Sequence, residues 1–111
     1  MAIKYIHIPE QKKTIAVISN AKYAAVHQIS RMVNNSKSIL FDPCEYLMSD
    51  SYRAVVVCHD EDKYSAEEGE CMAKRKLLNK YYGALDKRVD AFIADMNLVN
   101  KRINARHKNL K

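Results

Sequence analysis

The stretch Val55–Glu70 reads VVVCHDEDKYSAEEGE, and a strand pattern changes to a helix pattern within it. Its valines have the β-branched side chains that strands favour, and the surrounding run Arg53–Cys58 is continuously apolar after its first residue. Ser65 begins the capping form S-x-x-E, in which the serine oxygen and Glu68 each accept one free backbone N–H. We therefore expect a central strand covered on both faces, followed by a helix that begins at Ala66.

The same stretch contains thiol, imidazole and carboxylate groups, which are also the common metal ligands. Cys58 and His59 are adjacent, so on a strand their side chains point to opposite faces and do not easily bind one ion. Asp60 and Asp62 resemble the start of a calcium loop, but Ser65 stands where such loops need glycine. The chain also has only 2 glycines, too few for a glycine-rich phosphate loop. We expect no metal, no cofactor and no catalysis.

Composition places the chain among ordinary globular proteins. It has 111 residues, of which 48% are hydrophobic and 29% charged, and we expect a single domain over 1–111. The sheet-containing part is expected over 1–58 and the C-terminal helices over 64–108. No apolar run approaches the ~20 residues that span a bilayer, and no secretory segment is recognised, so we expect no membrane partner and a cytoplasmic location. The three cysteines form no C-x-x-C pair and are expected to be small buried thiols.

The first half of the chain predicts two hairpins and one helix. Ile3–Ile8 alternates apolar and polar residues, and Thr14–Ile18 is apolar, so these two segments form the first hairpin. Tyr46–Met48 and Tyr52–Cys58, joined by a turn-forming segment, form the second. Between them, Ala21–Asn34 has the helical pattern. Its core face is expected to carry Lys22, Val26, Ile29 and Val33.

The second half of the chain is helical. Gly69 costs about 1 kcal/mol relative to alanine in a helix, so we expect another part of the chain to approach it closely. Gly83 predicts a break between two helices, Ala66–Tyr82 and Ala84–Lys108. Apolar residues of the second helix recur at the heptad spacing of a coiled coil, which predicts a helical hairpin or a homo-oligomer, dimer or higher. This oligomer seam consists of Leu85, Val89, Phe92, Met96, Val99 and Ile103. The fold class is α+β, with a small, mainly antiparallel sheet, one helix in the first half and two C-terminal helices.

Positive charge gathers at the C-terminus. The net charge is +6, and residues 97–111 include no acidic residue. Arg102 and Arg106 are one helical turn apart, a spacing at which two guanidinium groups can grip neighbouring phosphates. Arg75 and Asn79 are also one turn apart, and a helical hairpin would bring them near the first pair. Tyr64 is a candidate for stacking on a base. Solvated or ion-paired side chains are the alternative interpretation of this cluster.

The segment Tyr52–Leu78 resembles a pattern of small phage proteins: a strand ending in Cys-x-x-x-Asp, an aromatic residue, a helix with an early glycine, and then Ala-x-x-Arg or a similar spacing, which in this chain is Ala-x-Arg. The residues that carry it are Cys58, Asp62, Tyr64, Gly69, Ala73 and Arg75. With a small sheet and paired arginines on a later helix, the chain is similar to the first-described Thoeris anti-defence sponges of phages. The family's pattern has proline after the cysteine, where this chain has His59.

The resemblance implies sequestration of a cyclic or phosphorylated nucleotide immune signal, either a cyclic ADP-ribose isomer or a cyclic oligonucleotide, without catalysis. It also implies dimers or larger assemblies in the host cytoplasm, with Arg102 and Arg106 on the phosphates. The basic last helix leaves a second function open, a small nucleic-acid-binding regulator. Direct inhibition of a protein partner is a third.

Overall fold

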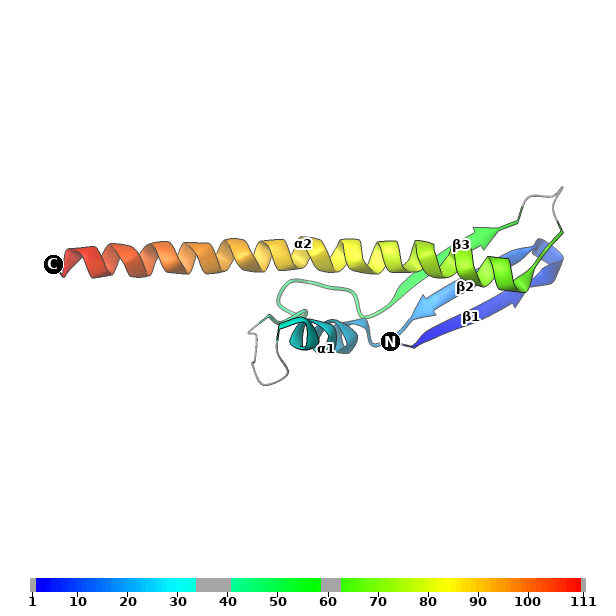
Figure 1. Ribbon diagram of the computed structural model, residues 1–111, viewed down its shortest axis with the longest axis horizontal. Helices are drawn as coiled ribbons and strands as arrows, with labels where there is room; N and C mark the ends of the chain where they lie inside the picture. The colour runs from blue at the N-terminus through cyan, green and yellow to red at the C-terminus, as the bar shows by residue number, and fades with distance from the viewer. Residues whose placement is uncertain (1, 34–40, 59–62, 111) are drawn as a thin grey trace.

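The computed structural model describes residues 2–33, 41–58 and 63–110. The expected helix end at Asn34 and the acids Asp60, Glu61 and Asp62 lie outside these residues. Along the chain the elements are β1 (Ile3–Ile8), the 3-10 turn η1 (Pro9–Gln11), β2 (Lys13–Ile18), α1 (Ala21–Val33), β3 (Tyr52–Val57) and α2 (Ala66–Asn109) (Figure 1). The expected α+β class is confirmed.

The three strands form one antiparallel sheet in the order β1-β2-β3. The first hairpin is confirmed, with Ile3 opposite Ile18 and Ile8 opposite Lys13. Its turn is closed by Lys12, whose φ of 50° lies in the left-handed region. β2 is therefore the central strand, and β3 pairs with it along one side only.

Two expectations about β3 are wrong. It lies at the edge of the described sheet, where Val57 is 60% exposed, because β2 takes the centre. Residues 43–47 form a turn rather than the partner strand of a second hairpin. Pro43 follows Asp42, whose side-chain Oδ1 accepts the backbone N–H of Cys44 at 2.9 Å. This local hydrogen bond offers the backbone an alternative to strand pairing.

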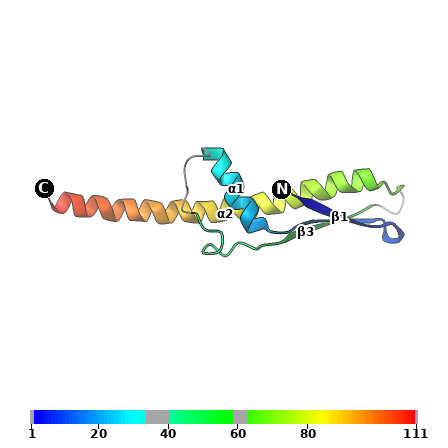
Figure 2. The same ribbon diagram turned by 90° about the horizontal axis from the view of Figure 1, so that it is seen from below.

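Helix α2 lies across one face of the sheet and then continues beyond it (Figures 1 and 2). Its buried residues recur at every fourth position, which is the spacing of one helical face. They are Ala73, Leu77, Tyr81 and Leu85. They meet the strand residues Ala16, Ile18 and Ala54, which are all 0% exposed, in a single hydrophobic core.

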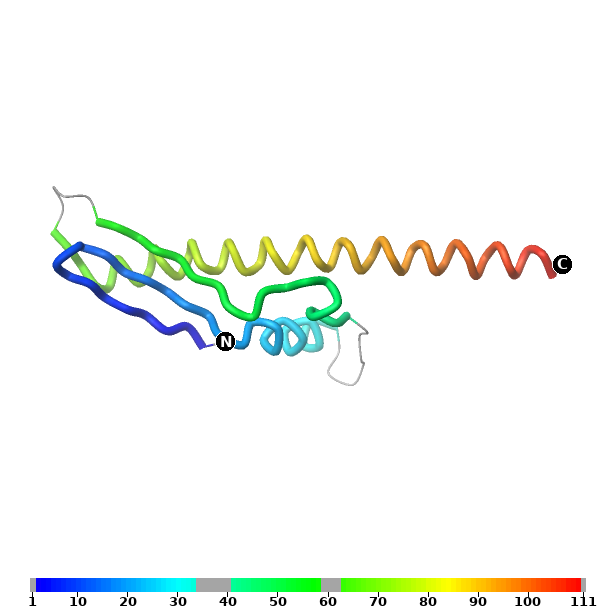
Figure 3. The backbone as a smooth tube through the Cα atoms, turned by 180° about the vertical axis from the view of Figure 1, so that it is seen from behind, coloured from blue at the N-terminus to red at the C-terminus, as the bar shows by residue number. Residues whose placement is uncertain are grey.

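The expected break at Gly83 is wrong, and with it the hairpin of two C-terminal helices. α2 is one helix of 44 residues, and Gly83 keeps a negative, helical φ within it. One glycine costs a helix about 1 kcal/mol, which the favourable helix formers around it offset. The molecule therefore measures 73 × 27 × 18 Å, and the C-terminal end of α2 has no other described element beside it (Figure 3).

Helix α1 is capped by a residue from another part of the chain. Asp50 accepts the backbone N–H of Ala21 on its carbonyl at 2.9 Å, and that of Lys22 on its carboxylate at 3.2 Å. The expected core face of α1 is wrong in part, because Val26 and Val33 are 48% and 52% exposed. The helix instead buries Ala21 and Ala25, with Ile29 packed beside them, because these small residues allow it to lie close to the core.

The cysteines also depart from expectation. None of the three, all of which are described, forms a disulfide. Cys44 and Cys71 are exposed and Cys58 is only partly covered, so the expected buried thiols are wrong. Cys44 lies in the turn after Asp42, and Cys71 lies in the second turn of α2.

The expected close approach at Gly69 is confirmed. A Cβ atom at this position would overlap Thr14 Oγ1 and lie 3.1 Å from Thr14 Cβ. Thr14 is 1% exposed, and its hydroxyl lies 3.0 Å from the hydroxyl of Tyr64, so it has little freedom to move away. Ala73, one turn further along α2, is fully buried. These small residues set the distance between the helix and the central strand.

We predict opposite effects for alanine at the two glycines. Gly69→Ala should lower the free energy of unfolding by about 1–3 kcal/mol, because its methyl group meets a packed and hydrogen-bonded threonine. Gly83→Ala should raise it by up to about 1 kcal/mol, because a Cβ there meets nothing within 4 Å. Urea denaturation measures both, and equal effects of the two substitutions would contradict the close packing.

Tyr81 is the largest side chain that the core encloses completely. Its hydroxyl donates to Gln28 Oε1 at 2.9 Å and so connects α2 to α1. Burial, with smaller contributions from Tyr82 and Tyr52, raises the pKa of Tyr81 from 10.0 to about 12. The folded state therefore disfavours the phenolate, and stability that is present below pH 10 is lost as the pH rises toward 12.

We predict that Tyr81→Phe flattens this alkaline loss of stability. The loss in the wild-type protein should be on the order of 2 kcal/mol between these pH values. Urea denaturation at neutral pH, pH 10 and pH 12 should show a smaller decline in the variant, after an initial loss of about 1 kcal/mol from the missing hydrogen bond. Tyr23→Phe, at a ring that is 71% exposed, is the matched control and should decline as the wild type does.

Candidate functional site

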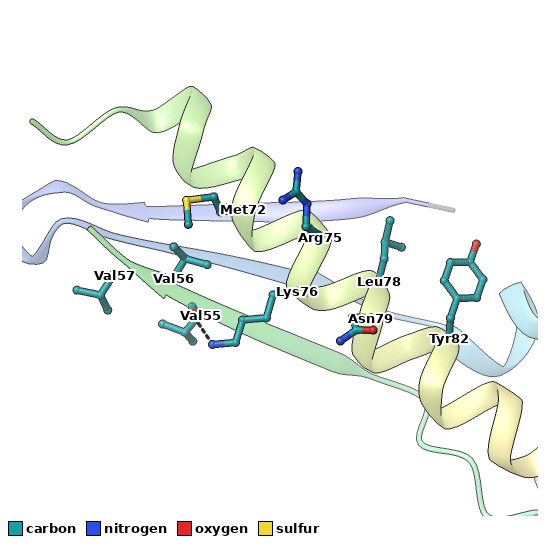
Figure 4. A pocket seen from close by; sticks show the side chains of 9 residues that line it. All are labelled: Val55, Val56, Val57, Met72, Arg75, Lys76, Leu78, Asn79 and Tyr82. Carbon is teal, nitrogen blue, oxygen red and sulfur yellow. Dashed lines mark hydrogen bonds between the residues drawn. The ribbon is translucent and has the colours of Figure 1, made fainter. Parts of the chain in front are cut away.

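An open groove of about 840 Å³ lies between α2 and the edge strand β3 (Figure 4). Its apolar lining comes from both elements and its polar side chains come from α2. The lining residues are Val55, Val56, Val57, Met72, Arg75, Lys76, Leu78, Asn79 and Tyr82. The groove therefore combines an apolar lining with two cations, an amide and a phenol, and a largely apolar lining with a few polar groups is the usual composition of a small-molecule site.

The polar residues reach the groove because α2 is regular there. Ser65 Oγ accepts the backbone N–H of Glu68 at 3.3 Å, so the expected N-cap is confirmed and the helix register is fixed from Ala66 onward. Arg75 and Asn79 then lie one turn apart, as expected, and Tyr82 follows one turn after Asn79. All three side chains are exposed and available to a ligand.

Two lysines join α2 to the outer edge of β3. Lys76 Nζ donates to the carbonyl of Val55 at 3.0 Å, and Lys80 Nζ donates to the carbonyl of Arg53 at 2.8 Å. These carbonyls belong to alternate residues of an edge strand, so they point away from β2. The lysines satisfy these acceptors and place positive charge along the edge, which is a recognised protection against edge-to-edge pairing.

The structure separates the two expected anion-binding pairs within one chain. Arg102 and Arg106 are exposed on the C-terminal extension of α2. Because α2 is continuous, Arg102 lies about 40 Å from Arg75 at a rise of about 1.5 Å per residue. The hairpin that would have joined the pairs is absent from the described chain. Each pair is one turn apart, but a single chain does not bring the two pairs together.

Tyr64 lies in a polar cluster away from the groove. Its hydroxyl is 2.8 Å from His7 Nδ1 and 3.0 Å from Thr14 Oγ1. His7 Nε2 is 3.1 Å from Glu70 Oε1, so the histidine connects β1 to the first turns of α2. Within the described residues Tyr64 fastens the helix start to the sheet, and Tyr82 is the aromatic residue beside Arg75 and Asn79.

The oligomer seam divides into two parts. Leu85 is 6% exposed, and Val89 and Phe92 pack against the core of their own chain. Met96, Val99 and Ile103 are 42%, 45% and 59% exposed. A hydrogen bond of 2.6 Å from the Tyr46 hydroxyl to Asp95 Oδ2 holds α2 where the two parts meet, and it raises the pKa of Tyr46 to about 12.

A second groove, of about 650 Å³, lies on the inner part of this seam. Its residues come from α1, from α2 and from the segment between α1 and β3, and they are almost all apolar. They are Ile29, Met32, Val33, Phe41, Tyr82, Gly83, Leu85, Asp86, Val89 and Phe92. Ile29 and Val33 of the face expected for α1 line this groove, but the residues of α2 and the segment before β3 that complete it are distant in the sequence and share no local pattern with them.

Metal-binding clusters and membrane-spanning helices are both absent from the described residues. Within residues 2–33, 41–58 and 63–110, no three histidine, cysteine or acidic side chains are close enough to hold an ion. Across those same ranges no helix is sufficiently long and apolar to cross a bilayer. No family model, no curated protein and no solved structure matches the chain.

We predict that the edge lysines keep the protein from self-pairing through β3. Lys76→Met combined with Lys80→Met should increase aggregation, because the carbonyls of Val55 and Arg53 become available to another strand. Light scattering during incubation measures the effect. Lys74→Met with Lys87→Met, at exposed positions of the same helix, changes the charge equally and should leave the scattering at the wild-type level.

Proposed function

We propose that this protein is a non-enzymatic, phage-type anti-defence protein that binds and sequesters a cyclic or phosphorylated nucleotide. The observation that supports this function is the groove of Figure 4, which Arg75, Asn79 and Tyr82 line together with apolar residues of α2 and β3. A guanidinium group grips phosphate oxygens, an amide can bind the edge of a base, and a phenol ring can stack on its face. Sequestration needs enclosure of the ligand and no reacting group.

The resemblance to Thoeris anti-defence sponges favours an immune signal as this ligand. A cyclic ADP-ribose isomer and a cyclic oligonucleotide both carry phosphates and a base, and these are the parts that the groove residues are able to bind. The protein would act in the host cytoplasm by lowering the free concentration of the signal. This part of the proposal rests on the sequence pattern around Tyr64, Gly69 and Arg75.

A second copy of the chain would complete the site. The heptad spacing of the seam extends toward the N-terminus through Tyr82, Leu78 and Arg75. α2 therefore carries one continuous strip from Arg75 to Arg106, whose C-terminal apolar part is exposed in the single chain. Covering it removes several half-exposed aliphatic side chains from water, at about 25 cal/mol per Å² of apolar surface.

Antiparallel pairing fits this strip. In heptad notation the seam residues alternate between position a (such as Val89) and position d (such as Phe92). With a two-fold axis between Asp90 and Ala91, each a position of one helix lies opposite a d position of the other, as antiparallel seams require. In this register the partner's Met96 and Val99 face Leu85 and Tyr82, at the apolar groove between α1 and α2. The seam residues that face each other are Arg75 with Arg106, Leu78 with Ile103, Tyr82 with Val99, Leu85 with Met96 and Val89 with Phe92.

This pairing has an electrostatic consequence. It brings the partner's Arg106 beside Arg75, so the two expected anion-binding pairs approach each other between subunits. Without a ligand, like charges face each other and weaken the dimer. A bound phosphate group relieves this repulsion, and ligand binding and dimer formation therefore strengthen each other.

We predict that one cyclic nucleotide of a panel raises the melting temperature and the dimer fraction together, because it neutralises the facing arginines. Differential scanning fluorimetry and sedimentation velocity measure the two effects. Mass spectrometry after heat release should recover the ligand intact. Arg102→Ala with Arg106→Ala should abolish binding, since truncating charge-assisted hydrogen bonds costs about 1.5–3 kcal/mol each. Lys101→Ala with Lys108→Ala removes equal charge from the same exposed helix and should retain binding.

Other outcomes separate the alternatives. No shift across cyclic ADP-ribose isomers and cyclic oligonucleotides would overturn the sponge proposal. The acid-free, exposed end of α2 favours a second candidate, nucleic-acid binding. In that case duplex DNA or RNA should be retarded at low salt, with a steep decline of affinity as salt rises. Direct inhibition of a protein partner would leave both assays silent.

A further inference from the structure

The sheet has a second face that α2 does not cover. Because side chains alternate along a strand, the core takes Tyr5, Ala16 and Ala54 from one face, and their strand neighbours point to the other. From the pairing register, this far face is a grid of nine residues in three rows. The rows are Lys4, Val17 and Arg53; Ile6, Ile15 and Val55; and Ile8, Lys13 and Val57.

The far face is apolar although it meets solvent. Six of the nine residues are Ile or Val, and none is an uncharged polar residue. Ile6 and Val57 are 43% and 60% exposed, whereas Ile15 at the centre of the grid is 9% exposed. When one face of a sheet remains in water, the side chains that point to that face are normally polar. Contiguous exposed aliphatic residues on a sheet are instead typical of an interaction surface.

The charges around this apolar centre have one sign. Lys4 and Arg53 stand at two corners of the grid, and Lys13 lies in the opposite row. Along the β3 edge, Lys76 and Lys80 bring two further ammonium groups to the strand's carbonyls. No residue of the grid is acidic. An apolar centre with a charged rim is the usual anatomy of a protein interface.

We propose that the far face binds an acidic amphipathic segment of another protein. Its aliphatic residues would cover the row of Ile6, Ile15 and Val55, and its carboxylates would meet the cations at the rim. A second copy of this chain does not fit, because two such faces would oppose cations to cations. Nucleic acid fits less well, because six aliphatic side chains offer bases neither hydrogen bonds nor aromatic stacking. The grid also contains none of the aromatic and leucine residues that insert into lipid.

Selection from a random displayed peptide library tests this assignment. Enriched peptides should combine aliphatic residues with Asp or Glu. Ile6→Asp with Val57→Asp should weaken their binding by about ten-fold or more, measured by fluorescence anisotropy. Ile93→Asp with Leu98→Asp, at α2 residues that are 49% and 46% exposed, is the matched control and should leave the affinity unchanged.

Charge reversal provides a second variant that does not disturb the apolar packing. Lys4→Glu with Arg53→Glu changes two exposed side chains and should shift the selected peptides from acidic to basic. The proposal would be overturned if the enriched peptides had no acidic bias. It would also be overturned if Ile6→Asp with Val57→Asp bound them as tightly as the wild-type protein does. Binding to phosphatidylserine vesicles that these substitutions abolish would assign the face to lipid instead. Loss of self-association in Ile6→Asp with Val57→Asp would assign the far face to a second copy of the chain.

Discussion

The contact between Gly69 and Thr14 is the constraint on which the rest of the structure depends. The helix backbone rests on a buried threonine of the central strand, and no other amino acid fits at position 69 without displacing it. This contact fixes the height of α2 above the sheet. From there the helix register carries Leu77 and Tyr81 into the core and leaves Arg75, Asn79 and Tyr82 on the open side. The core and the candidate groove thus follow from one close approach.

One chain builds a small core and leaves three apolar surfaces outside it: the end of the seam, the groove between α1 and α2, and the far face of the sheet. A short chain buries a smaller fraction of its surface than a long one, so association is its usual remedy. The seam and the groove between α1 and α2 lie on the same side of α2 and suit one helical partner. The far face differs in shape and is rimmed by cations, which points to a different partner.

Sequence patterns predicted the features that depend on neighbours in the chain. The first hairpin, the Ser65 cap and the crowding at Gly69 were all visible in local spacing and residue type. The expectations that were wrong depend on tertiary context. Whether Gly83 breaks a helix depends on its surroundings, and a continuous apolar strand can lie at the edge of a sheet with one face exposed, as β3 does. The cap on α1 comes from Asp50, 28 residues further along the chain, and no local pattern reveals it. Of the site, the pairs Arg75 with Asn79 and Arg102 with Arg106 were predicted, but not the distance between them.

The hydrogen bond from Tyr46 to Asp95 is the last one that joins α2 to another element of the described chain. Beyond it, no other part of the described chain contacts the final turns of the helix through a hydrogen bond, and isolated helices of such length are marginal in water. Their amide protons should exchange with solvent quickly in a solitary chain and slowly once a second surface covers them. The helical order of the last third of α2, for example at Ile103, therefore reports what fraction of the protein is paired.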